Sequence, residues 1–204
     1  MNSPLVHEKM RAAILPVVHF MLCAGCASAA GPASADFTAQ TDQEQAVWEA
    51  VLRTFVSSST RQLVVRDSAY ARPARTIASA RLLRRFREAS PELVESFIDA
   101  NSNSRPLPAF SDIGLPVRRV GDAELAPFVN VDDPYEFWSA FYEAYAESPG
   151  LIRLSRVGID PSKNLALVSV SHTCGSLCGT GKYTLLSRAS GEWEVIDEWV
   201  VLIS

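Results

Sequence analysis

Apolar residues recur at helical spacing in several parts of the chain. The first part follows Thr41 and Glu44, which have the S/T-x-x-E spacing of a capping box, so we expect an amphipathic helix from residue 41. A second helix is predicted over 77–87, and a third from Ser90 and Pro91, an N-cap residue followed by proline. The apolar positions behind these predictions are Val47, Trp48, Val51, Leu52, Phe55 and Val56, then Leu82, Leu83 and Phe86, then Leu93, Val94, Phe97 and Ile98.

A fourth helix is predicted from Asp133, Pro134 and Glu136, which have the order of an N-cap acid, an N1 proline and an N3 glutamate. Large rings at helical spacing are typical of a helix that covers a sheet, so we expect this helix to pack its aromatic face on the C-terminal strands. An aromatic groove for a ligand is the alternative. The rings are those of Phe137, Trp138, Phe141, Tyr142 and Tyr145.

Strand patterns dominate the C-terminal part of the chain. Short strands are predicted at "QLVVR" (62–66) and "LPVRRV" (115–120), and from residue 151 four strands follow, at 151–159, 165–172, 182–188 and 193–204. Short connections favour antiparallel neighbours, so these four should form a meander. The sequence therefore predicts an α+β fold, with N-terminal helices packed on a C-terminal antiparallel β-meander in a single domain over 41–204.

The N-terminus has the pattern of an export signal. Lys9 and Arg11 precede an apolar run over 12–22, which is too short for a membrane helix of about 20 residues. We therefore interpret 1–26 as a signal peptide and the small residues in 27–40 as a flexible tether. Cleavage after "ASA" (27–29 or 33–35) fits ordinary signal peptidase, whereas "AGC" (24–26) resembles a bacterial lipobox with Cys26 as the acylated residue and the site of membrane attachment.

Charge and compartment narrow the classes of function. The 204 residues include 19 basic and 23 acidic side chains, a net charge of −4, which argues against nucleic acid as a partner. An exported chain is expected in the periplasm, at the outer membrane as a lipoprotein, or secreted. Disulfides persist in such oxidising compartments, and only Cys174 and Cys178 remain for the folded domain.

The stretch "SHTCGSLCGTGK" (171–182) carries the candidate chemistry. We expect a disulfide between Cys174 and Cys178 that closes a long, irregular hairpin connection, with Gly175, Gly179 and Gly181 supplying conformations with positive φ. The alternative is a thiol redox centre or a Cu or Zn site formed by His172 with both cysteines. A phosphate loop is excluded because the first glycine of that motif is missing and a strand, not a helix, follows.

The segment "SRVGID…ALVSVSHTCGSLCGTGKYTLLSRASGEWEVIDEWVVLIS" resembles the C-terminal region of a group of uncharacterised exported bacterial proteins. They share a Cys-Gly-x-Leu-Cys-Gly loop and a final pair of strands joined at a Gly-x-Trp turn. The resemblance covers about the last quarter of the chain. It implies a common domain and no known activity.

These patterns favour a non-enzymatic module that binds another, unidentified component of the cell envelope, and no cofactor is expected. The predicted contact is the concave side of the sheet or the cysteine-loop end; the redox or metal function above is the alternative. Two charged clusters are further candidates. The first is a group of arginines, which we interpret as a solvated helix face, with an anion-binding face as the alternative. The second is a set of acids that could provide a carboxylate pair for hydrolysis, although acids on one surface are common. The arginines are Arg72, Arg75, Arg81, Arg84, Arg85 and Arg87, and the acids are Glu194, Asp197 and Glu198.

Overall fold

The computed structural model describes residues 32–70, 79–110, 113–129 and 133–204. The helices within them are α1 (Pro32–Arg53), α2 (Ser79–Arg85), α3 (Pro91–Ala100), α4 (Asp122–Val129) and α5 (Pro134–Ala144). The strands are β1 (Leu63–Arg66), β2 (Ser68–Ala69), β3 (Arg105–Pro106), β4 (Val117–Val120), β5 (Leu151–Leu154), β6 (Gly158–Asp160), β7 (Leu165–Gly175), β8 (Cys178–Ser187) and β9 (Glu194–Ile203). The signal peptide predicted at 1–26, with Cys26, lies outside these ranges.

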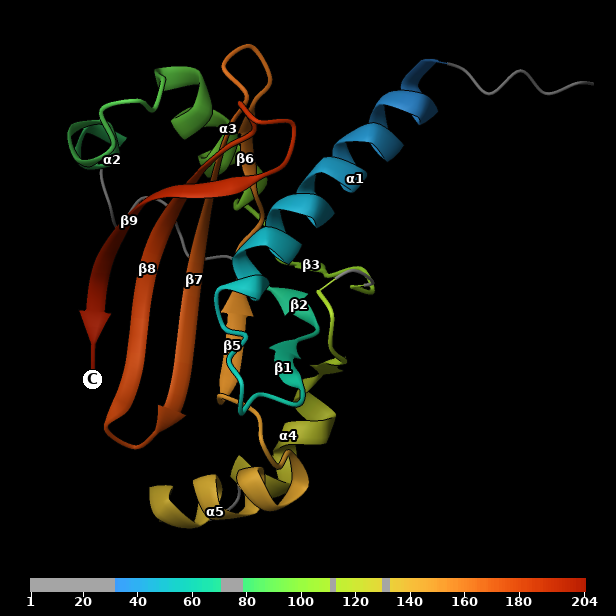
Figure 1. The fold of residues 1–204 in the computed structure, drawn as a ribbon, viewed down its shortest axis with the longest axis vertical. Coiled ribbons are helices and arrows are strands. Elements are labelled where there is room, and N and C mark those ends of the chain that lie inside the picture. The colour runs from blue at the N-terminus through green and yellow to red at the C-terminus, as the bar shows by residue number, and fades with distance from the viewer. Residues whose placement is uncertain (1–31, 71–78, 111–112, 130–132) are drawn as a thin grey trace, which may run out of the picture.

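A mixed sheet of seven strands organises the described chain (Figure 1). Its order is β4-β1-β5-β7-β8-β9, and β6 also pairs with β7. The strands β4, β1 and β5 run parallel to one another, while the pairs within β5 to β9 are antiparallel. The predicted α+β fold with its C-terminal meander is confirmed. The parallel half, in which β1 lies between β4 and β5, was not predicted.

The predicted strand over 151–159 is divided into β5 and β6, and both pieces pair with β7. Ser155 explains the interruption. Its N–H donates to the carbonyl of Ser169 (2.9 Å), and its Oγ accepts from the N–H of the same residue (2.8 Å). The side chain thus replaces a backbone acceptor, so the chain can bulge without leaving a buried donor unpaired.

Both faces of the meander are covered, because alternate residues of β7 point to opposite sides. Ala166, Val168 and Val170 pack in the cluster that contains Trp48 of α1. On the other face Leu165 and Leu167 pack with α2 and α3, through residues that include Leu82, Phe86, Leu93 and Phe97. The predicted faces of α2 and α3 are therefore confirmed, and so is the N-cap at Ser90, whose Oγ accepts from the N–H of Leu93. In the first helix the prediction fails at Val56, which lies beyond the end of α1 and is 38% exposed.

The start of the first helix was predicted wrongly. α1 begins at Pro32, so Thr41 is not an N-cap, and most of the predicted tether at 27–40 is helical. Proline at the first helical position and the alanines that follow it favour this earlier start. Glu44, assigned to a capping box, is 3% exposed and forms a bidentate pair with Arg156, at 3.0 Å from Nε and 2.5 Å from Nη2.

The aromatic helix α5 begins as predicted, with the carboxylate of Asp133 accepting from the N–H of Tyr135. Its packing differs from the prediction. Phe141 is fully buried, but it belongs to a cluster with α4 and with the parallel strands, which contribute Val64, Val120 and Leu151. Figure 1 shows α5 at the end of the sheet below β5, beside α4. The parallel strands provide an apolar surface there that the sequence did not reveal.

Candidate functional site

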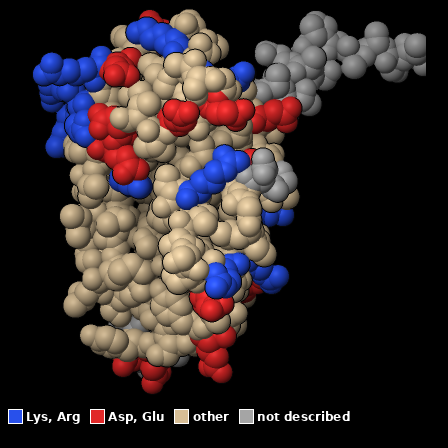
Figure 2. All heavy atoms as spheres, in the orientation of Figure 1, with Lys and Arg blue, Asp and Glu red and all other residues tan. Residues whose placement is uncertain are grey.

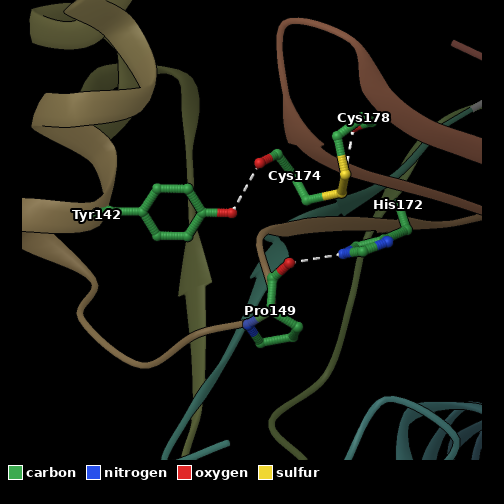
Figure 3. Close-up of a disulfide and its surroundings, with 5 residues drawn as sticks. All are labelled: Tyr142, Pro149, His172, Cys174 and Cys178. Carbon is green, nitrogen blue, oxygen red and sulfur yellow. Dashed lines mark hydrogen bonds between the residues drawn. A yellow bond between two sulfur atoms is a disulfide. The ribbon is translucent and has the colours of Figure 1, made fainter. Parts of the chain in front are cut away.

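The cysteine loop is a tight hairpin rather than a long connection. β7 and β8 are joined by Ser176 and Leu177 alone, and Gly175 pairs with Cys178 across the strands. The Cα atoms of Cys174 and Cys178 are 5.0 Å apart, and Figure 3 shows the bond between their sulfur atoms. The structure places the predicted pair at disulfide distance.

The glycines of this hairpin have a different role from the predicted one. Gly175, Gly179 and Gly181 are not among the described glycines with positive φ. A Cβ on Gly179 would lie 2.6 Å from Oγ of Ser204, and one on Gly181 would lie 3.3 Å from Cβ of Leu202. At both positions a larger side chain would meet the last residues of the chain, which lie against β8.

His172 does not join the cysteines in a site. Its Nε2 lies 2.8 Å from the carbonyl oxygen of Pro149, and its ring centroid is 5.2 Å from that of Phe55. Figure 3 shows the ring directed toward Pro149, while the hydroxyl of Tyr142 donates to the carbonyl of Cys174 (2.9 Å). Within the described part of the chain, no three His, Cys, Asp or Glu side chains are grouped as metal ligands.

The two charged clusters are largely paired with each other or solvated. Arg85 binds Asp197 (2.5 Å), and Lys182 binds Glu198 (2.6 Å), so each of these two carboxylates has its own basic partner. Glu194 accepts a hydrogen bond from the hydroxyl of Ser190 (3.0 Å). The Arg85 guanidinium holds the pKa of the Asp197 carboxyl below its ordinary value. Figure 2 shows basic side chains over the α2 end of the molecule with acidic ones beside them. Of the other arginines, Arg81, Arg84 and Arg87 are exposed, and Arg72 and Arg75 lie outside the described residues.

A pocket of about 420 Å³ lies elsewhere, near the carboxyl ends of the parallel strands. In sheets with parallel strands this edge is where ligands usually bind, because loops and helix starts converge there. Its charged residues are Arg66 at the end of β1, Asp122 at the start of α4 and Arg153 within β5. The rest of its wall consists of hydroxyl-bearing and apolar side chains. The lining residues are Arg66, Ser68, Tyr70, Ser104, Asp122, Leu125, Phe137, Leu151 and Arg153.

Arg66 is the last residue of β1, and its side chain is 14% exposed. It forms an ion pair with Asp122, the first residue of α4, whose side chain is 96% exposed. The hydrogen bond from Arg66 and then its charge lower the pKa of the Asp122 carboxyl, and the charge of Arg153 adds to the shift. The pocket therefore holds a carboxylate that is tied to a nearly buried cation but is itself surrounded by solvent.

Arg153 has no such partner. It lies in β5 on the same face as Leu151, because side chains two positions apart point to one side of a strand. Among the described residues it forms no hydrogen bond or ion pair. An arginine at a pocket wall with an unused donor fork is suited to a carboxylate or phosphate group.

The other polar groups of the pocket are already oriented. The hydroxyl of Tyr70 lies 2.6 Å from Oγ of Ser169, and Oγ of Ser104 donates to the carbonyl of Ala69 (2.6 Å). No histidine or cysteine occurs among the lining residues in the described ranges. The arrangement can hold an anionic group against an apolar wall.

The sequence did not predict this site, although two of its residues lie at the ends of predicted strands, where binding residues are common. Arg66 ends the predicted strand at 62–66, and Asp122 follows the predicted strand at 115–120 after one glycine. What could not be seen is that both strands are parallel neighbours, since short strands far apart in the chain give no pairing signal. Arg153 lies in a strand that was predicted only as part of the antiparallel meander, so its position beside the parallel strand β1 was not expected.

The fold and the pocket describe an α+β domain with an open, arginine-lined hollow. Comparison of the chain with protein-family models, curated proteins and solved structures gives no significant match. None of the helices in the described ranges has both the length and the apolar character needed to cross a membrane.

Proposed function

We propose that the chain is an exported, non-enzymatic binding module of the cell envelope, and that its pocket holds an oxoanionic group, a carboxylate or phosphate, of its ligand. The observation that carries this proposal is Arg153. Its donor fork forms no hydrogen bond or ion pair with the residues that the structure describes, and it shares the pocket with the nearly buried Arg66, which supports recognition of an anion.

The apolar part of the pocket supports a ligand larger than the anion itself. Leu125, Phe137 and Leu151 give it a hydrophobic wall beside the two arginines. Pockets that combine such a wall with a few oriented polar groups are typical of small-molecule and cofactor sites.

The cysteine pair and the signal-peptide pattern support the proposed location in the cell envelope. A bonded Cys174 and Cys178 are compatible with an oxidising compartment and leave no thiolate for redox chemistry or metal binding. This weakens the alternative function that used His172 with both cysteines. The proposal includes two forms of the processed protein: a lipoprotein attached to the membrane through Cys26, and a form released by ordinary signal peptidase.

The experiment is a titration of the isotopically labelled protein, followed by two-dimensional amide NMR. Inorganic phosphate and acetate are added separately, against sodium chloride at matched ionic strength. We expect both oxoanions to shift amides around Arg66 and Arg153, and Arg153→Met to abolish these shifts. Arg84→Met, which removes an exposed arginine of α2 away from the pocket, should leave them unchanged. Equal responses to phosphate, acetate and chloride would refute the proposal.

A further inference from the structure

The ion pair at the pocket is unusual in how its two members are exposed. Arg66 is nearly buried, whereas Asp122 is almost fully exposed. Because the Arg66 side chain is 14% exposed, its guanidinium lies in the pocket wall with little access to solvent. The Asp122 carboxylate can rotate into water, because Arg66 is its one hydrogen-bond partner among the described residues.

We infer that Asp122 is an internal competitor, which occupies Arg66 in the free protein and is displaced when a dianionic oxoanion binds both Arg66 and Arg153. This inference rests on the proposed function, because it concerns the same pocket. It assigns a ligand class, a phosphomonoester or inorganic phosphate, and a residue that selects for it.

The charges of the pocket support a dianion. With Asp122 in place, the lining carries two arginines and one carboxylate, so a single positive charge is left. After Asp122 leaves, two positive charges face the ligand. A monoanion is satisfied by Arg153 alone and gains little by opening the ion pair. A dianion balances both arginines and can form parallel hydrogen bonds with each.

Release of Asp122 is favoured by where it lies. At the first position of α4 a carboxylate interacts well with the free backbone N–H groups and the positive end of the helix, and this holds whether or not Arg66 is its partner. On the Asp122 side the ion pair is exposed, so water solvates this carboxylate once it separates from Arg66, while the ligand takes its place at the guanidinium. The displaced carboxylate therefore has a stable alternative environment.

The test compares Asp122→Asn with Glu124→Gln. Both substitutions remove one negative charge from the first turn of α4, but Glu124 binds Arg118 (2.6 Å) and accepts from the N–H of Gly121 instead of contacting Arg66. The pair therefore separates direct competition at Arg66 from the general effect of removing a charge near the pocket.

The probes are methyl phosphate, a dianion at pH 8, and dimethyl phosphate, a monoanion, each titrated by NMR at constant ionic strength. In the unmodified protein we expect methyl phosphate to bind more tightly and to shift the carboxyl carbon of Asp122, and dimethyl phosphate not to shift that carbon. In Asp122→Asn the affinity for both should rise, up to about fivefold, the factor that an exposed ion pair can supply. Glu124→Gln should match the unmodified protein.

Different failures identify different errors. If Arg153→Met abolishes binding but Asp122→Asn leaves both affinities unchanged or lowers them, Asp122 is not a competitor and the proposed anion site stands. Equal affinities for the two probes in the unmodified protein would also overturn the inference. If neither probe binds the unmodified protein or Asp122→Asn, the pocket is not an anion site, and both proposals fail.

Discussion

Replacing Phe141 by alanine tests how α5 is fixed to the domain. The Phe141 side chain is fully buried, and its ring lies among those of α4 and α5, with centroid distances of 5.0 Å to Tyr145, 5.2 Å to Trp138 and 6.4 Å to Phe128. Removing a buried phenyl ring loses its transfer free energy and leaves a cavity that neighbouring rings cannot fill by small movements. We expect a loss of about 3–5 kcal/mol in the free energy of unfolding.

For a domain of this size that loss corresponds to a fall of about 6–20 °C in Tm. Urea denaturation followed by far-UV circular dichroism gives the measurement and avoids the direct effect on Trp138 fluorescence. The matched control is Tyr135→Ala on the same helix, which removes a ring that is 69% exposed and should change stability by less than about 0.5 kcal/mol. A loss below about 1 kcal/mol for Phe141→Ala, or an equal loss for both variants, would refute this account of the cluster.

Three further predictions concern other parts of the molecule. Thiol labelling of unreduced protein should find Cys174 and Cys178 unreactive, and replacing both by serine should lower stability by about 2 kcal/mol, the loop-entropy value for so short a ring; two reactive thiols would contradict the disulfide. Hydrogen bonds from Ser162 and then Ser90 lower the folded-state pKa of Asp160, so its contribution is present at neutral pH and lost as the pH falls below about 4. Between about pH 6 and pH 3 the free energy of unfolding, measured by urea titration, should fall less in Asp160→Asn than in the unmodified protein. The same pH dependence in both proteins would exclude this role of Asp160. The intact mass of protein extracted from the cell envelope should correspond to a chain without the signal peptide, plus the mass of a lipid if Cys26 is acylated. A mass equal to that of the full chain would contradict the predicted export.

Local patterns were enough to predict much of the fold. Ser90 and Asp133 are N-caps as their spacing indicates, and Phe86 and Phe97 are buried on the predicted faces. Such elements are specified by residues three or four positions apart, which a sequence displays directly. The meander was likewise visible, because its strands follow one another through short connections.

Non-local contacts explain what was missed. The parallel pairing of β1 with β4 and β5 joins segments separated by whole helices, and no residue pattern within a strand specifies it. The role of Glu44 depends on Arg156, far along the chain, and so did not show in the helical pattern around it. The candidate pocket is formed by the same kind of long-range contact, which is why the sequence directed attention to the cysteine hairpin instead.

The attachment of α1 has a consequence for the order in which the chain folds. The indole N–H of Trp48 donates to the carbonyl of Ser155 (2.9 Å), and Glu44 pairs with Arg156, so the first helix made is anchored by residues made much later. Until those residues are available, the indole N–H of Trp48 and the carboxylate of Glu44 lack these partners, and α1 is not yet anchored at these two points. Non-local closure of this kind slows folding, because the entropy of closing a long loop is lost before the contact forms. The anchoring of α1 therefore couples the N-terminal helix to the C-terminal half of the chain, and the helix is fixed in place only after that half has been made.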